Sequence, residues 1–152
     1  MSTTPASSTT PTLTTDDEKA VYELHLGFVN ANRTADTAFL RANMVGGDEL
    51  IWENLNKSTY VGVDHICRLW DYIRHVTNGV PAQVETHDEK VSVVGDLAWV
   101  HSKLSFWADF GVHGKVTMPS RMVEIWQRID GDWKMVYFHC SSHEPGGWEG
   151  GL

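Results

Sequence analysis

The 152-residue sequence has few basic residues and only two cysteines. Twelve lysine and arginine residues stand against 20 aspartate and glutamate residues, giving a formal net charge of −8. Because proteins bind nucleic acid through lysine and arginine contacts to phosphates, we expect no nucleic acid partner. Cys67 and Cys140 fit neither a metal-site spacing nor a disulfide framework, so we expect free thiols in a reducing cytoplasm.

The sequence also lacks the run of about 18 apolar residues that a membrane-spanning helix needs. Its N-terminus has no basic stretch followed by an apolar one, so we expect no export, no membrane partner and a cytoplasmic location. It has neither a glycine-rich phosphate loop nor a nucleophile elbow. Since the histidines form no close pair on one helix face, we predict no metal site and chemistry without a cofactor.

An apolar share of 41% and seven tryptophans are typical of one globular domain. Residues 1–14 are rich in serine, threonine and proline and have almost nothing to bury, so we predict a disordered tail. The folded domain is predicted over residues 15–143. A glycine-rich C-terminal tail is expected over residues 144–152.

Helices are predicted in the first half of the domain. Thr15 to Glu18 has the form of a capping box, and apolar residues at helical spacing follow it, with His25 between two apolar stripes. Two further helices are predicted at about residues 37–44 and 64–77, separated by a strand over residues 50–55 and a polar turn.

The sequence after Pro81 is typical of antiparallel strands. Turn residues separate four predicted strands, at about residues 82–94, 97–109, 116–129 and 133–142. Helices followed by a long meander define an α+β domain. A strongly curved sheet wrapped around a helix leaves a cavity at its wide end, where a small ligand would bind.

Residue parity sorts the side chains of each strand into two faces. Three of these faces mix large aromatic residues with a few ionisable ones, as a ligand cavity requires. They are the odd face of segment 97–109 (with Trp99, His101, Lys103 and Trp107), the even face of segment 116–129 (with Met122, Glu124 and Trp126) and the odd face of segment 133–142 (with Tyr137 and His139). Parity alone leaves open whether the three faces point to the same side.

The segment from Gly95 to Ser141 carries a specific pattern. Its notable residues are Gly95-Asp96, Leu104, Asp109, Gly114, Trp126, Arg128, Asp130-Gly131, Trp133 and His139-Cys140-Ser141, and Trp52-Glu53 and Gly62 precede them. In order and spacing this pattern resembles the association domain of calcium/calmodulin-dependent protein kinase II. The resemblance extends over residues 16–143, and its C-terminal third is the most specific part.

That domain belongs to the NTF2-like superfamily, which includes ketosteroid isomerases and SnoaL-like polyketide cyclases. The resemblance implies a cone-shaped curved antiparallel sheet around N-terminal helices, a homodimer or higher homo-oligomer, and a pocket lined by the last strand. It places Lys103, Glu124, Tyr137 and His139 on the pocket side. The kinase domain has arginines where this chain has Lys103 and Glu124, so the pocket chemistry differs.

Five residues are candidates for catalysis. His101 and His139 can exchange protons near neutral pH, although His139 could have only a structural role. Glu124 is either an acid or base, or the ion-pair partner of Lys103 or His101. Lys103 could stabilise an oxyanion, and Tyr60 could donate a hydrogen bond. The predicted substrate-binding residues, each of which could instead belong to the core, are Trp52, Trp107, Trp126, Tyr137, Met122 and His25.

The leading hypothesis is a cofactor-independent lyase or isomerase that acts by acid–base catalysis on an aromatic or polycyclic small molecule. Loss of formaldehyde from a lignin-derived diaryl-propane diol is one reaction of this kind in the SnoaL-like group. Two alternatives remain open: a ligand-binding or oligomerisation module like the kinase domain, and a carrier of a hydrophobic intermediate.

Overall fold

The computed structural model describes residues 10–142, apart from the side chains of Val116 and Met118. The elements of this part of the chain are α1 (Asp16–Thr34), α2 (Thr37–Asn43), β1 (Ile51–Glu53), β2 (Thr59–Val61), α3 (Val63–Val76), β3 (Gln83–Val94), β4 (Leu97–Asp109), the 3-10 turn η1 (Gly111–His113), β5 (Lys115–Ile129) and β6 (Asp132–Ser142). Residues 10–14 form neither helix nor strand. The rest of the predicted N-terminal tail and the predicted tail 144–152 lie outside the described residues.

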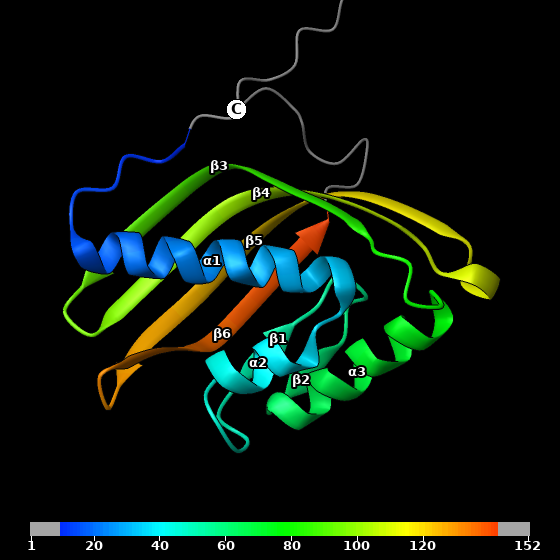
Figure 1. Cartoon of the computed structure of the whole chain (residues 1–152), viewed down its shortest axis with the longest axis horizontal. Coiled ribbons are helices and arrows are strands. Elements are labelled where there is room, and N and C mark those ends of the chain that lie inside the picture. Colours follow the sequence, from blue (N-terminus) through cyan, green and yellow to red (C-terminus); the bar gives the residue numbers. More distant parts are fainter. Residues whose placement is uncertain (1–9, 143–152) are drawn as a thin grey trace, which may run out of the picture.

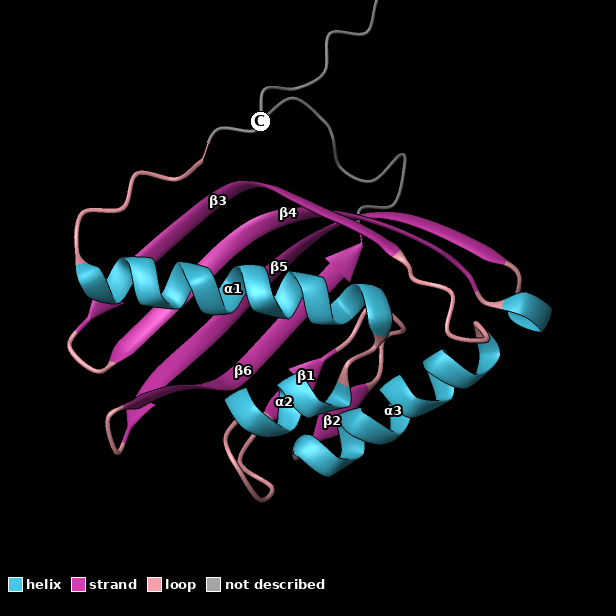
Figure 2. Cartoon of the chain, viewed as in Figure 1, coloured by secondary structure: helices cyan, strands magenta, loops and turns pink. Residues whose placement is uncertain are grey.

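The six strands form one curved sheet with the order β2-β1-β6-β5-β4-β3. Figure 1 shows α1 lying across its concave face, with α2 and α3 beside β1 and β2, and Figure 2 shows how far β3 to β6 extend beyond α1. The predicted α+β architecture, a curved sheet against N-terminal helices, is confirmed. The sheet is mixed rather than purely antiparallel, because β1 runs parallel to β6, and the three-residue strand β2 was not predicted.

The N-terminus of α1 is capped as the sequence predicts. Thr15 Oγ1 accepts a hydrogen bond from the Glu18 amide at 3.1 Å, and the Glu18 carboxylate accepts one from the Thr15 amide at 3.1 Å. These bonds satisfy amides that the first turn would otherwise leave unpaired. The helix then buries one face against the sheet, with Val21, His25 and Phe28 fully enclosed.

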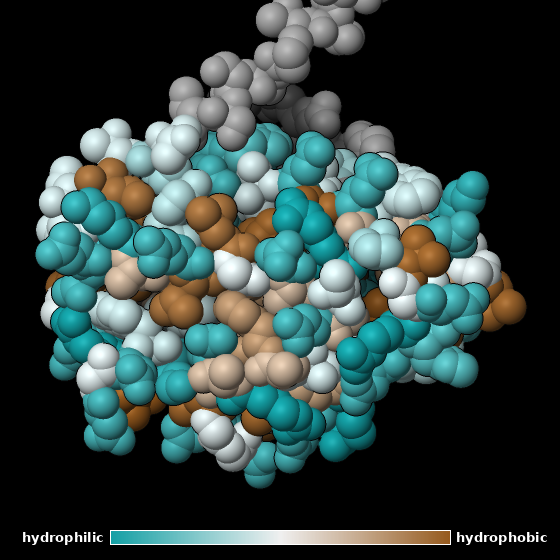
Figure 3. Space-filling view, in the orientation of Figure 1, coloured by the Kyte–Doolittle hydropathy of each residue, from teal (hydrophilic) through white to brown (hydrophobic). Residues whose placement is uncertain are grey.

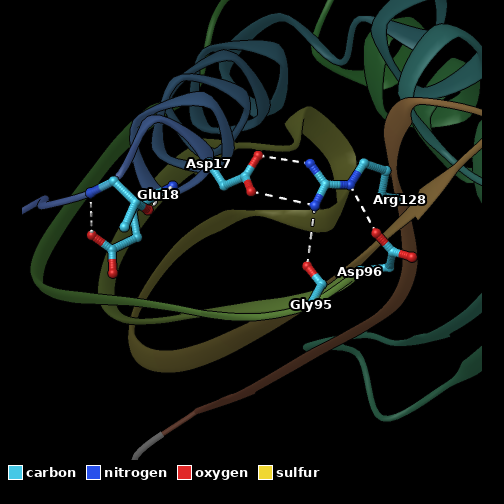
Figure 4. A network of polar contacts seen from close by, with 6 residues as sticks. Asp17, Glu18, Gly95, Asp96 and Arg128 are labelled. Carbon is cyan, nitrogen blue, oxygen red and sulfur yellow. Dashed lines mark hydrogen bonds and ion pairs between the residues drawn. The ribbon is translucent and has the colours of Figure 1, made fainter.

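Arg128 fixes the N-terminal end of α1 to the sheet (Figure 4). Its guanidinium donates to both carboxylate oxygens of Asp17, at 2.8 and 3.3 Å, and to Asp96 at 2.9 Å. It also lies over the ring of Trp133, 4.7 Å from the ring centre. The first helix therefore cannot shift along the sheet without breaking several charge-assisted contacts.

Two β-bulges decide which side chains of the sheet face α1. In β6, Met135 pairs with Trp126 while Tyr137 pairs with Ile125, so Val136 is an extra residue. In β3 the register shifts between His87 and Lys90, where Asp88 has a φ of 53°. A bulge reverses the alternation of side chains along its strand, so residue parity on one side of it does not carry over to the other.

Candidate functional site

A cavity of about 310 Å³ lies between the C-terminal end of α1, helix α3 and the concave face of the sheet. Its size is at the lower end of the range for small-molecule sites. Apolar side chains form most of its wall. From α3 they include Leu69, Trp70, Ile73 and Val76, and from the sheet Val84, Leu104, Phe106, Ala108, Met122 and Phe138.

The polar groups of the cavity wall come from α1, α3 and the loop after β1. Asn32 and Arg33 belong to α1, Asn54 and Asn56 to the loop after β1, and Tyr72 to α3. The face of the molecule that carries α1 is mostly hydrophilic, and polar residues interrupt its hydrophobic ones (Figure 3). An apolar interior with a few polar groups is the usual composition of a ligand site.

A buried histidine and glutamate pair lies on the same side of the sheet. His25 Nδ1 is 2.7 Å from Glu124 Oε1, and both side chains have no exposed surface. Trp126 Nε1 donates to the other carboxylate oxygen of Glu124 at 3.0 Å. Both oxygens of Glu124 are therefore satisfied, and the carboxylate fixes the orientation of the imidazole.

The second nitrogen of His25 has no hydrogen-bond partner in the described structure. Glu89 Oε1 lies 3.7 Å from this Nε2 atom, too far for a hydrogen bond, and accepts instead from Thr86 Oγ1 at 2.7 Å. The bulge in β3 is what turns Glu89 inward. Ser102, on the neighbouring strand, also has an unpartnered buried oxygen. Unpaired buried polar groups are uncommon and often have a functional explanation.

The environment of His25 raises its pKa. Burial by itself lowers that pKa, because it disfavours the charged imidazolium, but the charge and hydrogen bond of Glu124 and then the charge of Glu89 outweigh this effect. Both carboxylates therefore favour the protonated imidazole, with Nδ1 bonded to Glu124 and Nε2 near Glu89. A carboxylate that orients one imidazole nitrogen is a feature of histidine acid–base pairs.

The pair does not form part of the cavity wall, although neighbouring residues of α1 and β5 do. Val29 follows His25 by one turn of α1, and Met122 precedes Glu124 on the same face of β5. Both Val29 and Met122 line the cavity. The pair is thus adjacent to the cavity wall along both elements.

The prediction that His101, Lys103 and Trp107 face the pocket is wrong. These three side chains are exposed on the outer face of β4, and Lys103 pairs there with Asp88 at 2.8 Å. The inner face of β4 consists of Ala98, Val100, Ser102, Leu104, Phe106 and Ala108. Apart from Phe106, these are small or aliphatic side chains, which let α1 pack closely on the sheet.

The same correction applies to Tyr137 and His139. The bulge at Val136 turns both to the outer face of β6, where the Tyr137 hydroxyl lies 3.2 Å from His139 Nδ1. Phe138 and Cys140, which parity placed on the packing side, line the cavity instead. Burial raises the pKa of the Cys140 thiol to about 12, so it stays protonated at neutral pH.

The other predicted binding residues divide between the cavity and the core. Trp52 and Met122 line the cavity, while Trp126 is buried beside Glu124. Tyr60 is half-buried in β2, outside the cavity wall, and its hydroxyl accepts from Asn56 Nδ2 at 2.9 Å. Glu124 pairs with His25, and neither Lys103 nor His101 is its partner.

Several wall residues were missed because only the tertiary fold brings them together. The Tyr72 hydroxyl, on α3, lies 2.6 Å from Nε2 of His113, in η1, although 41 residues separate them. Arg33 reaches β3, where its Nη2 donates to the Val84 carbonyl at 2.7 Å. The helical periodicity of α1 and α3 could have indicated which helix faces point inward, but it carries no signal for these contacts.

Among residues 10–142, no group of three or more histidine, cysteine, aspartate and glutamate side chains has an arrangement that could hold a metal ion. In the same part of the chain, no helix combines the length and apolar character needed to cross a membrane. The predicted cytoplasmic location stays a prediction.

A curved mixed sheet that encloses a cavity together with its helices defines an NTF2-like protein. The chain belongs to the SnoaL-like domain family, whose model matches residues 21–144. No curated protein matches the sequence.

Solved structures with the same fold share little sequence with this chain. A suspected dehydratase of the NTF2-like family from Streptomyces avermitilis is 19% identical, with a TM-score of 0.73 over 85% of this chain and 97% of that one. A suspected aromatic ring hydroxylase from Novosphingobium aromaticivorans is 16% identical, with a TM-score of 0.73 over 88% and 94%. The association domain of C. elegans CaMKII is also 16% identical, with a TM-score of 0.64 over 84% and 100%. At such identities the likeness concerns the fold alone.

Proposed function

We propose that the chain is an acid–base lyase or isomerase whose substrate is an apolar, ring-containing small molecule. The observation that carries this proposal is the buried pair beside the cavity: Glu124 holds Nδ1 of His25, whose pKa is raised and whose Nε2 has no hydrogen-bond partner. A buried titratable group with a shifted pKa beside an apolar cavity is a candidate for proton transfer. The aromatic side chains of Trp52, Trp70 and Phe138 favour a ring-containing ligand.

The pair can serve a reaction that begins with protonation of oxygen. In a loss of water, Nε2 of His25 gives its proton to the leaving hydroxyl group and the C–O bond breaks. The neutral Nε2 then removes a proton from the adjacent carbon, the double bond forms, and the imidazolium is restored. Glu124 keeps its charge throughout and stabilises the cationic form of His25. Because His25 does not line the cavity, wall side chains have to move for the substrate oxygen to reach Nε2.

The test is a turnover screen of lignin-derived diaryl-propane diols, steroid enones, polyketide intermediates and hydroxylated ring compounds. We expect His25→Gln to lower kcat/KM for an active substrate by at least about 100-fold, because general acid–base groups contribute about 100- to 10,000-fold. His75→Gln, an exposed histidine on α3, is the control and should change kcat/KM less than about twofold. His101→Ala tests the catalytic residue that the sequence alone suggested. A large loss of kcat/KM in His101→Ala, with little change in His25→Gln, would contradict the proposal.

A second candidate function is a binding or carrier module without turnover. It is favoured by one observation: His25 and Glu124 do not line the cavity and have no exposed surface. In that case the pair only stabilises the fold. Tight stoichiometric binding of a ring compound, with no conversion of any compound in the screen, would support the module over the enzyme.

We also propose that two copies associate through the outer face of the sheet. Trp99 and Trp107 are 38% and 37% exposed there, and on the same face of β5 half-buried Ile125 lies opposite Trp99. Exposed apolar side chains gathered on one face are typical of an interface. Light scattering should give a mass of at least twice 17.1 kDa. The double variant Trp99→Lys/Trp107→Lys should lower this mass. Val112→Lys, which changes an exposed residue of η1, is the control and should leave the mass unchanged. A parent protein that is already monomeric would contradict the proposal.

A further inference from the structure

The described wall of the cavity contains no aspartate or glutamate, although the chain has 20 such residues and a net charge of −8. One wall residue carries a positive charge, Arg33 on α1, and His113 in η1 adds an imidazole to the wall. The charge of the wall is thus opposite in sign to that of the whole chain. An anionic ligand is repelled by the protein as a whole, so it needs such local groups to bind.

Arg33 has no carboxylate partner within residues 10–142. Its Nη2 donates to the Val84 carbonyl at 2.7 Å and its Nη1 to Asn30 Oδ1 at 3.5 Å, and both acceptors are neutral. Other arginines of the chain do pair with aspartates, namely Arg41 with Asp64, Arg74 with Asp71 and Arg128 with Asp17 and Asp96. The two hydrogen bonds fix the guanidinium against β3 and leave its charge uncompensated.

The Tyr72 and His113 pair adds hydrogen-bonding groups to the same wall. The 2.6 Å contact joins α3 to η1, and η1 itself packs tightly on the end of α3. A Cβ atom at Gly111 would lie 3.1 Å from the Val76 carbonyl oxygen, and the φ of Gly111 is 59°. Glycine at this position lets the turn approach α3 closely, which places the imidazole of His113 on the wall.

We propose that the cavity selects ring-containing molecules that carry one anionic group, such as a carboxylate, a phenolate or a sulfonate. The ring body lies among the apolar side chains, and the anionic group binds the Arg33 guanidinium, whose planar N–H groups match such oxygens. Tyr72 and His113 are further hydrogen-bond partners for polar atoms of the ligand. This inference rests on the proposed function in one respect only, namely that the cavity is the ligand site.

Two fluorescent probes with the same ring skeleton test the inference. Anilinonaphthalene sulfonate carries an anionic group, and phenylnaphthylamine lacks it. We expect the parent protein to bind the sulfonate more tightly than the neutral probe, one molecule per chain. Arg33→Gln should weaken sulfonate binding by about tenfold or more, because a hydrogen bond to a charged group contributes about that factor. Binding of the neutral probe should change less than about twofold.

Two further variants complete the test. Arg33→Lys keeps the charge and should retain most of the preference for the sulfonate. Arg74→Gln removes an exposed charge of α3 outside the cavity wall and should leave both affinities unchanged. Equal binding of the two probes, unaffected by Arg33→Gln, would overturn this inference and leave the proposed function standing. If neither probe binds, both proposals fail.

Discussion

Replacing Glu124 by glutamine is expected to lower the free energy of unfolding by about 3 kcal/mol, because removal of one partner of a buried charged pair leaves the other uncompensated. The glutamine can still accept from Trp126 Nε1, so the loss reports mainly on the contact with His25. Urea denaturation followed by circular dichroism measures the change.

The same variant should also alter the pH dependence of stability. The pKa of His25 is raised in the folded state, so its contribution is fully present below the unfolded value of about 6.5 and is lost as the pH rises through the folded value. The groups that face His25 are Glu124, Glu89 and the ring of Tyr22. With Glu124 replaced, the decline in stability above pH 6.5 should become smaller.

The double variant His25→Gln/Glu124→Gln is the matched control. It replaces both charged groups by neutral ones of similar size, and paired replacement of buried ions is often close to neutral in stability. We therefore expect it to be more stable than Glu124→Gln alone. Equal stability of the parent and the single variant, with unchanged pH dependence, would show that His25 and Glu124 do not form a charged pair.

Ala108→Trp is expected to lower the affinity for phenylnaphthylamine by at least about tenfold. Ala108 is buried on the inner face of β4 and lines the cavity, so an indole at this position occupies space that a ligand would need. Because the indole fills a cavity that is already present, the stability cost should remain below the roughly 1–3 kcal/mol typical of a fully packed core. Fluorescence titration gives the affinity, and thermal unfolding gives the stability.

Ala38→Trp makes the same substitution at an exposed position of α2, away from the cavity wall, and should leave the affinity unchanged. Unaltered probe binding in Ala108→Trp would mean that the probe binds elsewhere. In that case the cavity is not the ligand site.

Local sequence signals were sufficient for most of the secondary structure. The capping box at Thr15 predicts the start of α1, which begins at Asp16, and turn residues such as Gly95-Asp96 separate the long strands. Both signals act within a few residues and need no tertiary information. β2 was missed because its three residues, Thr59–Val61, are too few to show a period.

The faces of the strands could not be predicted in the same way. An aromatic and polar mixture on one face of β4 favoured a pocket, yet Trp99, His101 and Lys103 lie on the outside. In β6 the extra residue Val136 reverses the alternation, and no glycine or proline near it marks the bulge. The choice of inner face depends on how closely α1 packs on the sheet, which is a property of the tertiary structure.

The central pair shows how far the sequence could lead. Both His25 and Glu124 were candidates from the sequence, the first for substrate binding and the second for catalysis. Their contact joins residues 99 positions apart, so no spacing rule could identify it. Glu89 was not a candidate, because its inward direction depends on the bulge between His87 and Lys90.

The pH dependence of kcat/KM, compared with the pKa of His25 measured by NMR, tests the central claim most directly. We predict that kcat/KM falls as the pH rises through a value above about 6.5, and that the NMR signal of His25 titrates at the same pH, because the cationic imidazole is the proton donor. The account would be contradicted if His25→Gln kept the kcat/KM of the parent protein. It would also be contradicted if kcat/KM of the parent rose with pH over this range.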